Sequence, residues 1–120
     1  MFIPRLFGGY ADVPWHSSGN YTQSAQAFLF SLHSPSGVGP VKLPLVQNHQ
    51  NAIFCGASHG PIFGGGNDLH VANCANSTTS SCTTLGITYQ LPPGQSAQTF
   101  FTGSRHFQAA EVEVYQVQLQ

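Results

Sequence analysis

The chain has 120 residues and a formal net charge of −1, and only 6% of its residues are charged. Hydrophobic residues make up 41% and aromatic residues 12%, enough for one buried core, so we expect a single domain over residues 1–120. Arg5, Lys42 and Arg105 are too few to form a nucleic-acid-binding patch. No apolar run approaches the roughly 18 residues of a membrane span, so we expect no transmembrane segment.

Short apolar runs separated by Gly and Pro follow one another along the chain, which is typical of a β protein with many turns. Residues 27–32 (Ala-Phe-Leu-Phe-Ser-Leu) predict a buried strand that ends at the turn sequence 33–37. Pro44 lies inside the predicted extended stretch 41–46 and indicates a sheet edge or a bulge there, because proline has no backbone N–H to donate. The further predicted extended stretches are residues 41–46, 52–55, 61–63, 69–72 and 83–91. The sequence therefore predicts a mainly β fold.

The last segment, residues 111–119, alternates between polar and apolar residues and predicts a half-buried strand. Val112 and Val114 share one face of that strand, whereas Tyr115, Val117 and Leu119 share the other. The change of phase indicates either a bulge or a strand that is covered on both sides.

Possible catalytic groups are few, and each has a structural interpretation. Glu111 and Glu113 lie two apart on the predicted strand, so their carboxylates are about 6–7 Å apart, a spacing that suits a glycosidase pair. A solvated strand face explains them as well. Cys55 and His59 suggest a thiol–imidazole pair, but Cys55 ends an apolar strand and is interpreted as a packed core thiol. We therefore expect no enzyme and no cofactor.

Asp68 and His70 follow the glycine run 64–66, which lacks the Lys-Ser/Thr of a phosphate-binding loop. A metal site needs three or four converging ligands, and no HxH, HxxxH or CxxC spacing occurs. We therefore expect no metal site, and we expect the Asp68 side chain to cap a turn by accepting nearby backbone N–H groups.

Cys74 and Cys82 bracket a loop rich in Ser and Thr, and we predict that they form a disulfide while Cys55 stays a free thiol. Closing a loop of this size stabilises by about 2–3 kcal/mol in the chain-entropy model. Asn20 and Asn76 begin glycosylation sequons. The low charge and the sequons favour an extracellular or lumenal protein over a cytoplasmic one.

Three aromatic residues, Tyr10, Trp15 and Tyr21, lie close together in a region rich in Asn and Ser. Such a cluster suits a platform on which a sugar stacks. A folded N-terminal aromatic cluster explains the same residues equally well, so a sugar ligand stays an alternative.

Several short motifs, taken in order, resemble a TLDc domain. They include Phe-Gly-Gly-Tyr at residues 7–10, Pro14-Trp15, the strand 27–32, the glycine-rich stretch 60–71 and residues 85–89. The ending is also similar: residues 101–107 give a small-residue turn and an aromatic, and residues 111–115 give an acidic–apolar strand. The resemblance covers nearly the whole chain and corresponds to the C-terminal two-thirds or so of the family domain.

The resemblance implies a two-sheet antiparallel β-sandwich with short peripheral helices, in which the N-terminal part of the family domain is missing. It implies a core that contains Phe28, Phe30, Phe54, Phe63 and Phe107, and it places Glu111 and Glu113 as the acidic pair of the closing strand. Family members dock onto other proteins without catalysis, resist oxidative stress, and in several cases regulate the vacuolar proton-pumping ATPase.

These implications predict a non-catalytic interaction or structural module that binds a protein partner or a second copy of itself. Because the first strands of the family domain are missing, we expect unpaired sheet edges and an uncovered apolar patch near Phe7, Phe28 and Phe30. Low net charge leaves little repulsion to oppose self-association.

Overall fold

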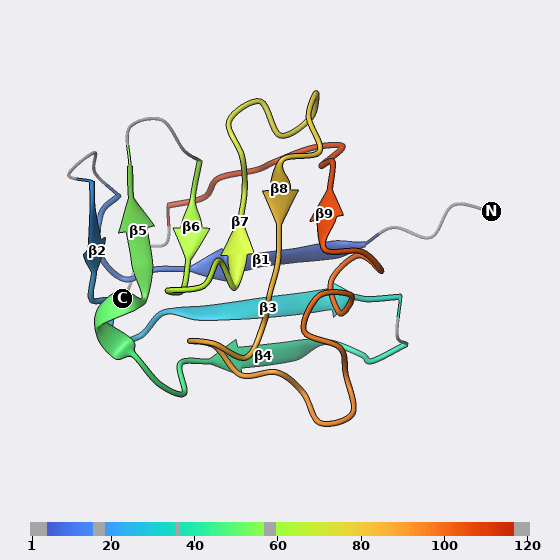
Figure 1. Ribbon diagram of the computed structural model, residues 1–120, viewed down its shortest axis with the longest axis horizontal. Helices are drawn as coiled ribbons and strands as arrows, with labels where there is room; N and C mark the ends of the chain where they lie inside the picture. Colours follow the sequence, from blue (N-terminus) through green and yellow to red (C-terminus); the bar gives the residue numbers. More distant parts are fainter. Residues whose placement is uncertain (1–4, 16–18, 36, 57–59, 117–120) are drawn as a thin grey trace.

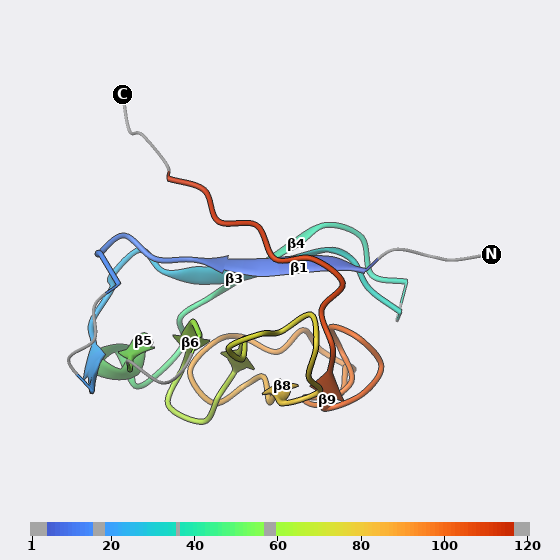
Figure 2. The ribbon, with the colours of Figure 1, turned by 90° about the horizontal axis from the view of Figure 1, so that it is seen from above.

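The computed structural model describes residues 5–15, 19–35, 37–56 and 60–116, and it is mainly β. Two antiparallel sheets, one of three strands and one of six, form two layers. Figure 1 shows the strands of one sheet running across those of the other, and Figure 2 shows the two layers side-on. The expected two-sheet antiparallel architecture is therefore confirmed.

The three-stranded sheet contains β1 (Leu6–Tyr10), β3 (Phe28–His33) and β4 (Val41–Pro44), in the order β1-β3-β4. Leu29 pairs with Leu43, and both side chains are buried on the face that meets the other sheet. Pro44 ends the edge strand β4, where its missing N–H breaks no interior ladder.

The six-stranded sheet is built from short strands in chain order. They are β2 (Asn20–Thr22), β5 (Ile53–Cys55), β6 (Ile62–Phe63), β7 (Leu69–His70), β8 (Ser81–Cys82) and β9 (His106–Phe107). Within the described ranges, helix is confined to one 3-10 turn, η1 (His49–Asn51).

A long connection between β8 and β9, residues 83–105, contributes much of the core without forming a strand. Its Tyr89, Phe100 and Phe101 are fully buried, and the Tyr89 hydroxyl donates a hydrogen bond to the Ala52 carbonyl at 2.7 Å. The strand expected over residues 83–91 is reduced to a single bridge between Leu45 and Tyr89. Gly86, at φ 92°, turns the backbone there, because such a conformation interrupts an extended chain.

The two layers approach closely where β1 crosses β6. A Cβ at Gly9 would collide with the ring of Phe63, so this glycine makes room for a buried phenylalanine between the sheets. Phe7, on the same face of β1, stacks on Phe101 with ring centroids 4.6 Å apart. The patch expected to be uncovered near Phe7 is therefore partly filled by the connection that follows β8.

The expected aromatic core is correct in part. Phe63 and Phe107 are buried, whereas Phe28, Phe30 and Phe54 are only half-buried. The reason is alternation along the strand: Leu29 of β3 points into the core, so its neighbours Phe28 and Phe30 point to the opposite face.

The strand expected over residues 111–119 is not formed in its described part. Residues 111–116 are exposed, and Figure 2 shows them running away from both sheets. A strand needs a neighbour for its backbone hydrogen bonds, and no described strand lies beside this segment. Residues 117–120 lie outside the described residues.

Candidate functional site

The outer face of the three-stranded sheet carries an aromatic surface that no described strand covers. The Tyr10 and Phe28 rings lie with centroids 5.3 Å apart, and the Phe28 and Phe30 rings 6.4 Å apart. The Lys42 ammonium lies 4.4 Å from the centre of the Phe28 ring, a cation–π contact. We call Tyr10, Phe28, Phe30 and Lys42 the outer aromatic face.

Strand register brings these four residues together. Tyr10 pairs with Phe28 across β1 and β3, and Phe30 pairs with Lys42 across β3 and β4. Directly opposite residues share a face of the sheet, so the four side chains emerge on one side. A Cβ at Gly8 would lie 2.9 Å from the Phe30 ring, so the glycine lets this ring settle over the β1 backbone.

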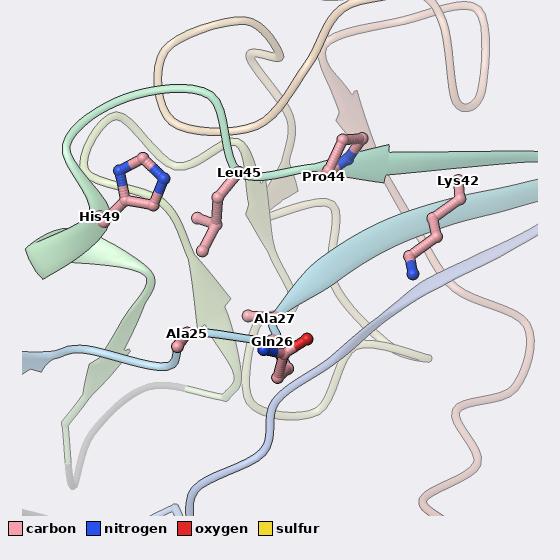
Figure 3. Close-up of a pocket in the computed structure, with 7 residues that line it drawn as sticks. All are labelled: Ala25, Gln26, Ala27, Lys42, Pro44, Leu45 and His49. Atoms are coloured by element: carbon pink, nitrogen blue, oxygen red, sulfur yellow. The ribbon is translucent and has the colours of Figure 1, made fainter.

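A small hollow adjoins this face, with a volume of about 160 Å³. Figure 3 shows its walls coming from the chain before β3 and from β4 and the residues after it. The lining residues are Ala25, Gln26, Ala27, Lys42, Pro44, Leu45 and His49. The volume is below the roughly 300 Å³ at which small-molecule sites begin, so a side chain of a partner suits it better than a metabolite.

Asp68 occupies a different kind of site, fully buried in the turn before β7. Its carboxylate accepts hydrogen bonds from the backbone N–H groups of Ile87, Thr88 and Tyr89, at 3.2, 3.0 and 3.0 Å. Burial raises the pKa of Asp68, while these hydrogen bonds act to lower it. The carboxylate caps a turn, as expected, but this turn is formed by residues 87–89, about twenty residues further along the chain. Local sequence patterns could not reveal so distant a partner.

One glycine, Gly64, lies against this carboxylate for a steric reason. A Cβ at Gly64 would collide with the Asp68 carboxylate, and Gly64 has a φ of 90°, which other residues rarely adopt. The Gly65 N–H donates to the Thr88 hydroxyl at 2.9 Å. The glycine run therefore packs against the loop of residues 87–89 and makes the Asp68 site structural.

The three rings of the expected sugar platform lie in different places. Tyr10 belongs to the outer aromatic face, and Trp15 packs edge-on against Phe63, which lies between the sheets. Tyr21 packs against Phe54, which alternates with core-facing Ile53 and so lies on the outer side of the six-stranded sheet. The fold therefore distributes the rings over separate surfaces.

The cysteines are not joined in the structure. Cys55 and Cys82 are buried, whereas Cys74 is exposed, with a φ of 55°. The Cys82 thiol faces His70 in the neighbouring strand, with Sγ 3.9 Å from Nδ1. Cys82 pairs with His70 and His106, whereas their neighbours Leu69 and Phe107 belong to the core, so the Cys82 side chain lies on the outer side of the six-stranded sheet.

The predicted glycosylation sites and the glutamate pair lie on the surface. Asn20 and Asn76, the sequon residues, are both exposed, and the Asn76 carbonyl accepts a hydrogen bond from the Gln108 side chain at 2.7 Å. Glu111 and Glu113 lie on the exposed C-terminal segment, where Glu113 accepts a hydrogen bond from the Tyr115 hydroxyl. His59 lies outside the described residues.

The described residues contain neither a group of three His, Cys, Asp or Glu side chains that could hold a metal ion nor a helix long and apolar enough to cross a membrane. Sequence reasoning did not find Lys42, because its place beside Phe28 depends on the register between β3 and β4. Period-two alternation showed that Phe28 and Phe30 share a face but not which face is buried.

Comparison with known proteins places the chain in a family. The family model of the TLDc domain matches residues 4–118, and this match is to the near-complete domain rather than to its C-terminal two-thirds. No curated protein and no solved structure matches the chain.

Proposed function

Since the chain belongs to the TLDc domain family, we propose that it is a non-catalytic docking module whose contact surface is the outer aromatic face and the adjoining edge of β1. The single observation that carries this proposal is the half-buried row of Tyr10, Phe28 and Phe30 on a sheet face that no described strand covers. Clustered aromatic side chains with a neighbouring cation are typical of the energetic centre of protein interfaces.

The surroundings of the face support the same function. Leu6, on β1, is 52% exposed, and Leu32 continues the outward row of β3. Adjacent exposed apolar side chains are unfavourable in water unless a partner covers them. The hollow beside Lys42 adds a recess that would accept one side chain of that partner.

The chemistry of the surface indicates the class of partner. β1 pairs with β3 on one side, and no described strand lies on its other side. Free N–H and C=O groups at such an edge bind an extended peptide by strand addition. Lys42 and Arg5, both exposed, favour acidic residues in that peptide. The proposed partner is therefore a protein with an extended acidic–apolar segment.

Site-specific photo-crosslinking tests the proposal. A benzophenone amino acid at Leu32, on the outer face, should crosslink the full chain to protein in an extract of its native source. The matched control carries the same group at Val46, which is exposed after β4 but lies outside the outer aromatic face. Equal crosslinking at the two positions, or none at Leu32, contradicts the proposed surface.

A sugar-binding module that uses Tyr10, Trp15 and Tyr21 stays the alternative function, and two of these residues, Trp15 and Tyr21, lie outside the outer aromatic face. Trp15 and Tyr21 are each 42% exposed, enough for a ring to contact a sugar. A thermal-shift screen with oligosaccharides separates the two functions: stabilisation that is lost in Trp15→Ala or Tyr21→Ala but kept in Lys42→Ala favours the sugar.

Resistance to oxidative stress and regulation of the vacuolar proton-pumping ATPase are finer roles that the family resemblance suggests. The Cys74–Cys82 disulfide, glycan chains on Asn20 and Asn76, and an extracellular or lumenal location form a second, mutually consistent set of proposals. Intact-mass measurement before and after reduction tests the disulfide, since its formation lowers the mass by about two hydrogens. Three free thiols and the absence of added glycan mass favour the roles in oxidative-stress resistance and in regulation of the proton-pumping ATPase.

A further inference from the structure

The C-terminal segment, residues 111–116, has the composition of a strand but lies outside both sheets. Val114 is 87% exposed and Tyr115 is 76% exposed, and both are residue types that favour strands. Val112 and Val114, which are 49% and 87% exposed, lie two residues apart and alternate with Glu111 and Glu113, a pattern typical of a strand that pairs with a neighbouring strand.

The root of the segment is held in place. The Ala109 N–H donates to the Ala75 carbonyl at 3.0 Å, and the Gln108 side chain donates to the Asn76 carbonyl at 2.7 Å. From this anchor the chain rises away from both layers (Figure 2). The segment is therefore presented outward from the body of the protein.

The best template for such a strand is the edge of β1. Of the four edge strands, β1 has five residues, whereas β4, β2 and β9 have four, three and two. Gly8 and Gly9 carry no side chains, so a neighbouring strand can approach closely there.

Charge complements this pairing. Glu111 and Glu113 make the exposed segment acidic. Of the two other acidic residues, Asp68 is buried and Asp12 accepts a hydrogen bond from the Ser24 hydroxyl. Arg5, one of the three basic residues besides histidine, immediately precedes β1 and is exposed. The acidic segment and the basic end of the edge strand therefore attract each other.

We propose that residues 111–116 of one copy add as a strand to the β1 edge of a second copy, and that the second copy returns the same contact. A two-fold arrangement satisfies both segments and both edges at once, whereas a one-sided contact leaves one of each exposed. This inference rests on the proposed docking function and names the strand that the edge accepts.

Analytical ultracentrifugation of the full chain over a dilution series tests the exchange. The intact protein should form a dimer that dissociates on dilution. Val114→Pro should raise the dimer dissociation constant about tenfold or more, because proline removes a main-chain donor and disfavours a paired strand. The matched control Val114→Thr keeps a β-branched side chain and should dimerise like the intact protein.

A charge swap tests the partner edge. Arg5→Glu and Glu113→Arg should each weaken the dimer about two- to fivefold, as expected for one exposed ion pair. The double variant should recover the affinity of the intact protein. Because Arg5 and Glu113 are both exposed, thermal unfolding measured at dilutions where the protein is monomeric should be unchanged in all three variants.

The outcomes separate this inference from the docking function. A protein that stays monomeric at every concentration, or a dimer that Val114→Pro leaves intact, overturns the strand exchange. Neither result affects crosslinking from Leu32 to another protein, which tests the docking surface itself. Conversely, a dimer that depends on Val114, together with no crosslink from Leu32 to another protein, supports the strand exchange and contradicts docking to a foreign partner.

Discussion

Two acidic regions of this small protein show opposite uses of the same functional group. Asp68 is fully buried and accepts three backbone N–H groups, whereas Glu111 and Glu113 project from an exposed segment outside both sheets. In a chain with only four acidic residues, this division is informative. The Asp68 carboxylate holds distant loops together, Asp12 accepts a hydrogen bond from the Ser24 hydroxyl, and the two glutamates are available for contact with another molecule.

The difference follows from desolvation. A buried carboxylate is tolerated only where hydrogen bonds compensate for lost water, so it becomes part of the fold. An exposed carboxylate keeps its water, contributes little to stability, and can exchange that water for a partner's cation. Substitutions in the two regions should therefore separate stability from association.

The largest expected effect is that of Asp68→Ala. It leaves three backbone N–H groups without their acceptor, and we expect a loss of roughly 3–5 kcal/mol of unfolding free energy, from about 1–3 kcal/mol per orphaned group with partial relaxation. Urea unfolding followed by tyrosine and tryptophan fluorescence measures it. Asp68→Asn keeps one carbonyl oxygen and should lose clearly less; equal losses in the two variants would contradict the acceptor role.

The second effect concerns the tight contact between the layers. Gly9→Ala introduces a methyl group against the buried Phe63 ring, and overpacking of this kind costs about 1–3 kcal/mol. Gly39→Ala is the matched control, because a Cβ there has no neighbour within 4 Å and its change should stay within about 0.5 kcal/mol. Unfolding midpoints in urea compare them, and two equally stable variants would show that the sheets are loosely packed at β1.

The third effect is a dependence on pH. Burial raises the pKa of Asp68 above its ordinary value of 3.8, so in the window between 3.8 and the folded pKa the folded state binds more protons than the unfolded state. Stability from this group therefore increases as pH falls through the window and is lost as pH rises through the folded pKa. Unfolding of the intact protein relative to Asp68→Asn, measured from neutral pH to about 3.8, should show this sign. The opposite slope would mean that the three N–H groups outweigh burial.

The smallest effect on stability is expected in the exposed region. Glu113→Gln removes a charge from a fully solvated segment, so the unfolding free energy should change by less than about 0.5 kcal/mol. Its consequence should be confined to association, where a lower affinity in the ultracentrifuge is expected. A clear drop in the unfolding midpoint of a monomeric sample would show that the segment packs on its own chain.

Several features of the fold could be predicted from the sequence. Apolar runs cut by Gly and Pro predicted a mainly β chain, and the motif order from Phe7 to Tyr115 predicted the family. The turn after His33 and the edge position of Pro44 also follow from local rules on turns and on the missing proline N–H. These successes share a cause, because each depends on neighbours in the chain.

Other features depended on contacts between distant residues. Alternation alone could not decide whether Leu29 or Phe30 faces the core, because a shift of one residue exchanges the faces. The loop that Asp68 caps could not be predicted for the same kind of reason, since residues 87–89 reach it only through the packing of the sheets. The alternating segment at 111–116 failed as a strand because alternation cannot supply a partner edge.

The sequence by itself therefore determined the β character, the turns and the family, all of which are set by local backbone preferences and residue order. Only the tertiary structure decided which aromatic rings lie outside, which carboxylate is buried and which strand edge is open. These depend on how two sheets pack face to face, and the free energy of that packing belongs to residues far apart in the chain.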